Sequence, residues 1–208
     1  MSAREGDCPP AWRRPPRCVV AIAASAGGQE ALTAVLAGLP ADFPAVVLVM
    51  QHLAPGHVSY LARILGRACA MPVVDSQEGE DLADAVVYVA PPDRHMTIPD
   101  WRIHLDGDPR VNFVRPSADV LFRSVAATAG DGAIAVVLSG SGHDGAEGTL
   151  AIKHAGGRVV AQDEATAGHF GMPGAAIAST SVDAILPLES IATALLDYVL
   201  DCPPMAYR

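Results

Sequence analysis

Apolar strand-like runs alternate with amphipathic helix-like segments along most of this 208-residue chain. Continuous apolar runs, typical of buried strands, occupy residues 18–24, 45–50, 85–90, 133–138 and 158–161. Apolar residues at helical spacing predict helices over residues 29–39, 59–68, 117–129, 147–154, 173–179 and 188–200. Shorter strands are predicted near Val73 and over 183–186, and a hairpin is predicted from residues 96–98 and 102–105, turning at Pro99 and Asp100.

This order of elements predicts parallel strands joined by right-handed crossovers. We therefore expect an α/β fold, a three-layer doubly wound sandwich with a mostly parallel sheet and a short antiparallel hairpin. Residues 18–208 are expected to form one domain, because no internal repeat or linker interrupts the pattern. Residues 1–17 are rich in proline and lack apolar periodicity, so they are expected to be a disordered tail.

The composition limits the partners of the chain. Half of the residues are hydrophobic but only 5% are aromatic, so Ala, Val, Leu and Ile must build the core, as suits a buried parallel sheet. The net charge of −9 argues against nucleic acid as a partner. The apolar runs are too short to span a bilayer, and the N-terminus lacks the apolar core of a signal peptide. We expect a cytoplasmic protein without membrane insertion.

The cysteines and most of the histidines indicate no metal site. The cysteines stand at positions 8, 18, 69 and 202 without metal-ligand or redox spacing, and isolated reduced thiols are expected in a cytoplasmic protein. No two of the loop histidines share an element at metal-ligand spacing; these are His57, His95, His143 and His169. His143 adjoins Asp144 and is expected to be a loop residue near the site, because adjacent residues rarely present their side chains to each other.

Three polar residues come directly after, or in the loop after, buried strands. Ser25 follows residues 18–24, His52 follows 45–50, and Asp144 lies in the loop after 133–138. Ligands bind at the carboxyl ends of parallel strands, so these side chains are expected at one sheet edge. They are the set that nucleophilic acyl transfer requires: Ser25 as nucleophile, His52 as base and Asp144 to orient the imidazole. The predicted helix after Ser25 would offer free N–H groups to an oxyanion.

Each of the three residues has a structural alternative. Ser25 before Gly27-Gly28 could cap a helix or belong to a nucleotide-binding loop, although the third glycine of a dinucleotide fingerprint and the lysine of a phosphate loop are missing. His52 could be a structural residue, and Asp144 could cap the next helix. The segment around Ser25 is also not Gly-x-Ser-x-Gly, which argues against an α/β-hydrolase proper. Their coincidence at one sheet edge favours the triad.

Six sequence blocks, three of which contain Ser25, His52 or Asp144, occur in a specific order. They are residues 21–28, 49–56, 88–95, 115–125, 138–145 and 171–173. Together they resemble the catalytic domain of chemotaxis protein-glutamate methylesterases, from about Cys18 to the C-terminal helix. The resemblance places the nucleophile, base and acid of that family on Ser25, His52 and Asp144. It implies hydrolysis of γ-glutamyl methyl esters on chemoreceptor helices with release of methanol, deamidation of certain receptor glutamines, and no cofactor.

The chain departs from the common pattern of that family in the residues beside the triad. Ala26 stands where many members have Thr, and the aspartate loop reads Gly-Ser-Gly-His-Asp instead of Gly-Met-Gly-Asn-Asp. The candidate residues of the oxyanion site and substrate groove are Ala26, Gly27, Ser141 and Met172. Typical members also carry an N-terminal receiver domain. Residues 1–17 are too few for one, so the resemblance predicts constitutive activity that phosphodonors do not change.

A second function from a different class is a catalytically weak binding module in a chemosensory signalling complex. The intact triad favours the hydrolase, whereas the altered aspartate loop leaves the binding module open. The partner that the resemblance implies is the methylated cytoplasmic domain of a chemoreceptor. A separate response regulator or methyltransferase of the same pathway is the further candidate.

Overall fold

The computed structural model describes residues 16–53, 59–179 and 182–202 of the chain. Most of the expected tail, together with Cys8 and His57, lies outside these residues. Seven parallel strands form the main sheet in the order β3-β4-β2-β1-β7-β8-β9. Their bounds are β1 Val19–Ala24, β2 Val46–Gln51, β3 Val73–Asp75, β4 Val87–Val89, β7 Ala133–Val137, β8 Arg158–Gln162 and β9 Ala184–Leu186.

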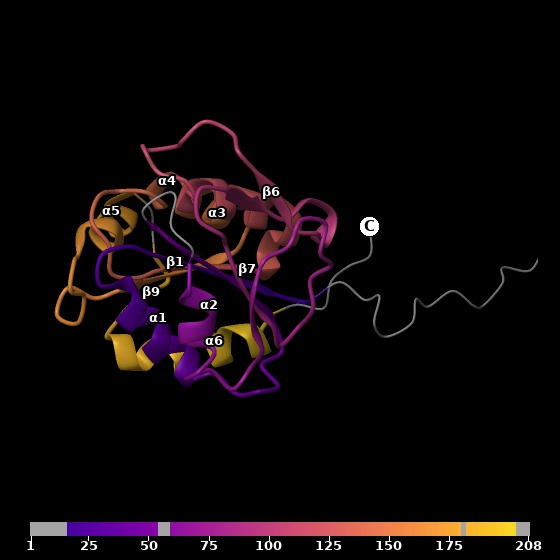
Figure 1. Cartoon of the computed structure of the whole chain (residues 1–208). Coiled ribbons are helices and arrows are strands. Elements are labelled where there is room, and N and C mark those ends of the chain that lie inside the picture. Colours follow the sequence, from indigo (N-terminus) through magenta and orange to yellow (C-terminus); the bar gives the residue numbers. More distant parts are fainter. Residues whose placement is uncertain (1–15, 54–58, 180–181, 203–208) are drawn as a thin grey trace, which may run out of the picture.

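Helices cover both faces of this sheet (Figure 1). One layer consists of α1 Gly28–Ala37, α2 Leu61–Leu65 and α6 Leu188–Leu200. The opposite layer consists of α3 Ala118–Ala129, α4 Ala146–His154 and α5 Gly171–Ser179. The hairpin of β5 His95–Thr97 and β6 His104–Asp106 is antiparallel, turns through a short 3-10 segment at Pro99–Trp101, and contacts α3. The predicted three-layer α/β sandwich with its antiparallel hairpin is confirmed.

The side chains of β1 explain why the strands are continuous apolar runs. Val20 and Ile22 belong to the core beneath one helix layer, and Val19 and Ala21 belong to the core beneath the other. Successive side chains of a strand point to opposite faces, so a strand covered on both sides needs apolar residues at every position. This requirement removes the polar alternation that marks half-exposed strands.

Three local predictions differ from the structure. The helix expected over 59–68 is the shorter α2, which ends at Gly66, a residue of low helix propensity. The helix expected from Pro173 already begins at Gly171. His95 lies in β5, where it is buried, and not in a loop.

A disulfide joins Cys18, the residue before β1, to Cys202 beyond the end of α6. Their Cα atoms are 6.4 Å apart, within the usual range for a disulfide, and Cys69 is free. The expectation of isolated thiols is therefore wrong for Cys18 and Cys202. They are 184 residues apart in the sequence, so their spacing carried no sign of the contact that the fold creates.

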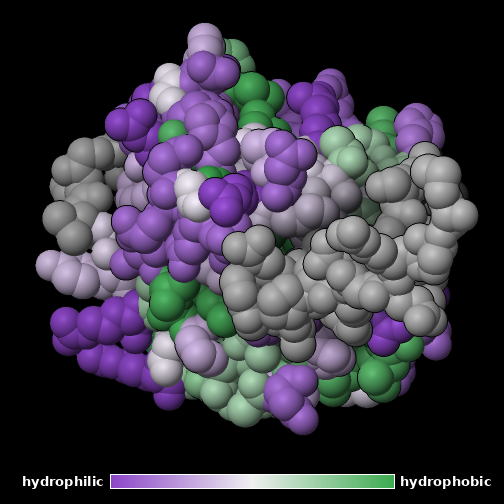
Figure 2. Space-filling view, turned by 90° about the vertical axis from the view of Figure 1, so that its right-hand side faces the viewer, coloured by the Kyte–Doolittle hydropathy of each residue, from purple (hydrophilic) through white to green (hydrophobic). Residues whose placement is uncertain are grey.

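In the coloured part of Figure 2, hydrophilic residues gather at the upper left and hydrophobic ones lie along the lower edge. None of the helices in the described ranges is both long enough and apolar enough to cross a membrane.

The link between Cys18 and Cys202 should make the stability of the protein depend on the redox state of the buffer. In the chain-entropy account, closing a loop of this length raises the free energy of unfolding by about 5 kcal/mol at most. We expect Cys202→Ser to lower the thermal unfolding midpoint in non-reducing buffer and to have a much smaller effect with dithiothreitol. Cys69→Ser is the matched control and should respond equally in both buffers. A wild-type midpoint that dithiothreitol leaves unchanged would contradict the link.

Candidate active site

Strand register brings Ser25 and His52 side by side. β1 and β2 pair in parallel with Ala24 opposite Gln51, so Ser25 and His52 are the next residues of two adjacent strands, which lie about 5 Å apart in a sheet. The N–H of His52 donates to the Ala24 carbonyl at 3.1 Å. On the other side of β1, the N–H of Ser25 donates to the Ser139 carbonyl at 2.9 Å. Ser25 is thus held between the loops that follow β2 and β7.

Asp144 meets His52 at this edge and is almost completely buried. His52 Nε2 lies 2.9 Å from Asp144 Oδ2, and Asp144 is 4% exposed. The Ala118 N–H also donates to Oδ2, at 2.6 Å. On Oδ1, the carboxylate accepts the Ser117 hydroxyl at 2.6 Å and Asn112 Nδ2 at 3.2 Å. Donors from three different segments therefore converge on one carboxylate.

These donors decide the charge of Asp144 and the proton position on His52. Burial alone would raise the pKa of Asp144, but the hydrogen bonds from His52, Ser117 and the Ala118 N–H together lower that pKa below its ordinary value. An ionised carboxylate only accepts hydrogen bonds, so Nε2 of His52 must carry the proton that points at Asp144. In neutral imidazole, Nδ1 then keeps its lone pair and can act as a base.

A second buried carboxylate, Asp119, lies behind the first. It accepts the Gly148 N–H at 2.6 Å and Asn112 Nδ2 at 2.7 Å. Burial raises the pKa of Asp119, the hydrogen bond from Gly148 opposes that rise, and the nearby Asp144 carboxylate adds to it. The Asn112 amide therefore donates to both carboxylates, which reduces the repulsion between their negative charges.

Ser139 ties together the loops around Ser25. Its hydroxyl donates to the Ala26 carbonyl at 2.7 Å and accepts the His169 N–H at 3.0 Å. In a trans peptide the C=O and the following N–H point in opposite directions, so fixing the Ala26 carbonyl turns the Gly27 N–H away from Ser139. Gly27 has a φ of 71°, and a Cβ there would lie 2.9 Å from the Ser139 hydroxyl. This turn therefore requires glycine.

The four candidate groove residues occupy different places. Ala26 and Gly27 follow Ser25 at the start of α1, and Ser141 is exposed on the aspartate loop. Met172 is fully buried, and its N–H donates to the Gly140 carbonyl at 2.8 Å. A Cβ at Gly140 would overlap the Met172 sulfur and lie 2.9 Å from Ser25 Cβ. Met172 thus packs against Gly140, which in turn lies against Ser25.

The hydroxyl of Ser25 makes no hydrogen bond to a side chain within the described ranges. Catalytic hydrogen bonds are often long without substrate and tighten when it binds. Two other histidines lie apart from His52 and Asp144. His143 is exposed, and His95 Nε2 lies 3.2 Å from the Pro109 carbonyl oxygen. The described part of the chain contains no group of three His, Cys, Asp or Glu side chains that could hold a metal ion.

Sequence patterns missed four residues that organise this site: Asn112, Ser117, Asp119 and Ser139. Ser117 is the N-cap residue of α3, but its side chain makes no helix-capping hydrogen bond and donates to Asp144 instead. Ser139 directly follows the predicted strand 133–138, the same signal that identified Ser25 and His52. Asn112 and Asp119 carried no comparable signal.

Comparisons with known proteins show which family this chain resembles. The family model described as CheB methylesterase matches residues 20–195. A protein-glutamate methylesterase/protein-glutamine glutaminase of Anaeromyxobacter dehalogenans is 47% identical over 179 residues, covering 85% of this chain and 52% of the relative. One from Caulobacter vibrioides is 42% identical over 177 residues, covering 83% and 51%.

A solved structure is also similar. The crystal structure of the Thermotoga maritima CheB methylesterase catalytic domain superposes with a TM-score of 0.83 at 34% identity, covering 86% of this chain and 97% of that one. This chain spans about half the length of the curated relatives that it matches.

The hydrogen bond from Ser117 should stabilise the protein only while Asp144 is ionised. We expect Ser117→Ala to lower the free energy of unfolding at pH 7 by about 2 kcal/mol, typical of a hydrogen bond to a charged group. Because the folded pKa of Asp144 is lowered, its stabilising contribution is present above the unfolded carboxyl pKa of about 3.9 and is lost as the pH falls through the folded value. The difference from wild type in urea unfolding should therefore shrink below about pH 4.

Ser179→Ala is the control for this experiment, because the Ser179 hydroxyl donates only to the backbone carbonyls of Ala146 and Ala176. Its effect on unfolding should be the same at pH 7 and at acidic pH. A Ser117→Ala difference that stays constant over that range would show that the hydroxyl does not act through the Asp144 charge.

Proposed function

The chain belongs to the CheB methylesterase family, and from this membership we propose that it is a serine hydrolase that demethylates γ-glutamyl methyl esters. The observation that carries the proposal is the buried His52–Asp144 hydrogen bond of 2.9 Å, in register beside Ser25. Deamidation of glutamine side chains uses the same steps, with ammonia as the leaving group in place of methanol.

The proposed reaction begins with attack of Ser25 Oγ on the γ-carbonyl carbon of the ester. His52 Nδ1 takes the hydroxyl proton, because Nε2 is committed to the Asp144 carboxylate. The new C–O bond converts the carbonyl oxygen into an oxyanion, and the imidazolium that forms is stabilised by the buried negative charge of Asp144.

The N–H groups of Ala26 and Gly27 are the proposed donors to that oxyanion. The Ser25 carbonyl accepts the Gly28 N–H at 2.8 Å, and the Ala26 carbonyl accepts the Ser139 hydroxyl. Both carbonyls therefore point into the protein, and the N–H groups of the same peptides, on Ala26 and Gly27, point away from it. Donors fixed before the charge develops are the main source of stabilisation in acyl transfer.

Collapse of the tetrahedral species breaks the bond to the methoxy oxygen. His52 returns the proton to that oxygen, methanol leaves, and the γ-carboxyl stays on Ser25 as an ester. A water molecule, deprotonated by His52, then attacks the acyl carbon. The bond from that carbon to Ser25 Oγ breaks, His52 returns the proton to Oγ, and the free glutamate side chain leaves. Each step balances without a cofactor.

The proposed substrate is the methylated cytoplasmic domain of a chemoreceptor, which would place the protein in the cytoplasm. A separate response regulator or methyltransferase of the same pathway is the further proposed partner. The domain assignment, residues 18–208 as the catalytic unit after a tail, belongs to the same proposal.

Replacing the nucleophile should abolish turnover. We expect Ser25→Ala to lower kcat for methanol release from a methylated receptor cytoplasmic fragment by about 10⁴-fold or more, since no other group can form the acyl-enzyme. An unchanged circular dichroism spectrum would establish that the variant is folded. Methanol release at the wild-type rate by the folded variant would remove Ser25 from the mechanism. A wild-type protein that binds the fragment but releases no methanol would instead be a binding module.

Replacing Asp144 should leave substrate binding intact but remove the preference of His52 for the tautomer that is protonated on Nε2. Asp144→Asn keeps the shape of the side chain but loses its charge and an acceptor, so the proton on His52 is no longer directed to Nε2. By analogy with other triads, kcat should fall by about 10⁴-fold while KM changes little. Steady-state kinetics on the same fragment measure both constants. Wild-type kcat in Asp144→Asn would mean that Asp144 has a purely structural role.

A further inference from the structure

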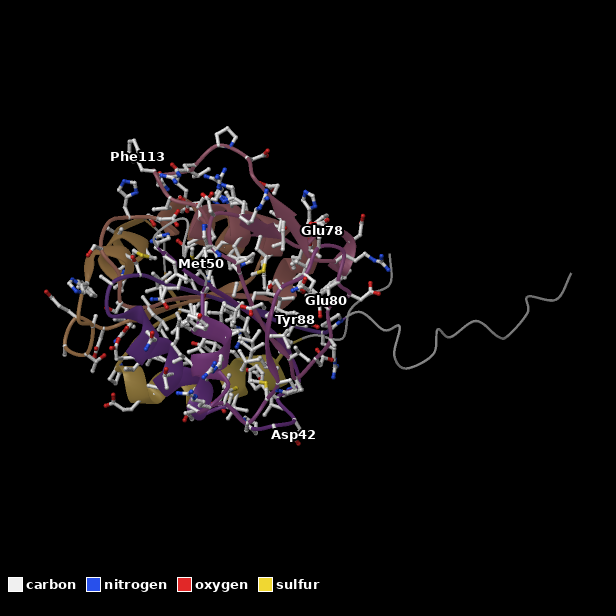
Figure 3. The ribbon with its side chains drawn as sticks, viewed as in Figure 1. Asp42, Met50, Glu78, Glu80, Tyr88 and Phe113 are labelled. Carbon is white, nitrogen blue, oxygen red and sulfur yellow. A yellow bond between two sulfur atoms is a disulfide. The ribbon has the colours of Figure 1, made fainter. Side chains whose placement is uncertain are left out.

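The loop between β6 and α3 exposes a large aromatic side chain beside the active site. Phe113 is 93% exposed, more than the other exposed large hydrophobic residues of the described ranges, Tyr60, Ile185 and Leu200. Figure 3 shows it at the outer margin of the molecule. Its ring is therefore free to contact another molecule.

The backbone at Phe113 is also unfavourable for this residue. Val111 and Val114 pair across a two-residue turn, with N–H to O distances of 3.2 and 3.0 Å. The central residues Asn112 and Phe113 both have left-handed φ values, of 52° and 66°. Such turns favour Asn at the first central position and Gly at the second. This chain has Asn as expected, but it places a bulky aromatic residue where glycine would fit without strain.

The same turn is anchored to the catalytic residues. Asn112 Nδ2 donates to Asp119 at 2.7 Å and to Asp144 at 3.2 Å. Arg115 donates to the Gly107 and Asp108 carbonyls and to the Asp93 carboxylate. These bonds hold the base of the loop, so that Asn112 points inward while its neighbour stands in solvent.

Phe113 also lies close to the proposed base. It lines a cavity of about 70 Å³ together with His52 and Leu53. A polypeptide substrate that reaches His52 therefore also comes close to Phe113. A methylated glutamate on a helix has neighbours three and four residues away on the same face, and these side chains can cover the ring.

We propose that Phe113 is a docking residue that selects polypeptide substrates by packing against apolar side chains of the helix that carries the esterified glutamate. This inference rests on the proposed function and specifies how the same site tells a protein ester from a small one. A free amino-acid ester has no neighbouring side chains that could pack on the Phe113 ring. A helical substrate gains the aromatic contact, and the turn holds the backbone of Phe113 in place before binding.

The test compares two substrates on the same variants. Phe113→Ala should lower kcat/KM for a methylated receptor cytoplasmic fragment by about tenfold, mainly through KM, as expected for loss of an aromatic anchor. For N-acetylglutamate γ-methyl ester α-amide, kcat/KM should stay within about twofold. Leu200→Ala is the matched control. Leu200 is 72% exposed at the end of α6, near Cys202, which contacts the residue before β1 at the sheet edge opposite Ser25.

A second variant separates docking from structure. Phe113→Gly should lose receptor-fragment turnover as Phe113→Ala does, while its thermal midpoint stays unchanged or rises, because glycine relieves the left-handed backbone. A lowered midpoint, an equal loss on both substrates, or undiminished activity on the receptor fragment would overturn the docking role. A shift of Phe113→Ala to a smaller species in size-exclusion chromatography would identify a second copy of the chain as the occupant and also overturn it.

Failure of the proposed function remains distinguishable from failure of this inference. If wild type releases methanol from neither ester, the hydrolase proposal fails. Binding of the receptor fragment to Ser25→Ala, with and without Phe113→Ala, then decides the docking role by itself. A tenfold weaker Kd in the double variant supports it, and an equal Kd overturns it.

Discussion

The arrangement of the candidate site depends on the hydrogen bonds to the buried carboxylate of Asp144. This carboxylate joins the end of β2 through His52, the start of α3 through Ser117 and the Ala118 N–H, and the loop before α3 through Asn112. A charge taken out of water is strongly destabilising unless donors replace its hydration. Several donors surround it here, so the carboxylate stays ionised and connects segments that are otherwise separate.

The same requirement shapes the residues around Asp144. Ser117 stands where a helix cap would stand, yet the Asp144 carboxylate caps the helix in its place by accepting the Ala118 N–H. Asp119 shares Asn112 with Asp144, which places two acidic groups around one amide. The position of His52 is then a consequence of where its acceptor is held, because strand pairing fixes only the His52 backbone.

The fold, and the placement of Ser25, His52 and Asp144 at one edge of the sheet, were predictable because both follow from strand pattern. Strands buried on both faces have apolar residues throughout, and the polar residues that end them mark the functional edge of a parallel sheet. That reasoning identified Ser25, His52 and Asp144. It did not find Asn112 or the Cys18–Cys202 contact, since both depend on how distant segments pack. The length of α2 was also missed, because helical periodicity continues past the glycine that ends the helix.

The order of the strands has a consequence for how the candidate site comes apart. Ser25, His52 and Asp144 follow β1, β2 and β7, the three middle strands of the sheet, whereas the edge strands β3 and β9 are only three residues long. Short edge strands open first when a domain fluctuates, and central strands exchange their amide hydrogens only in the rarest openings. Fraying at the margins therefore leaves the reactive groups assembled. The backbone that carries Ser25 and His52 therefore comes apart only with the centre of the sheet.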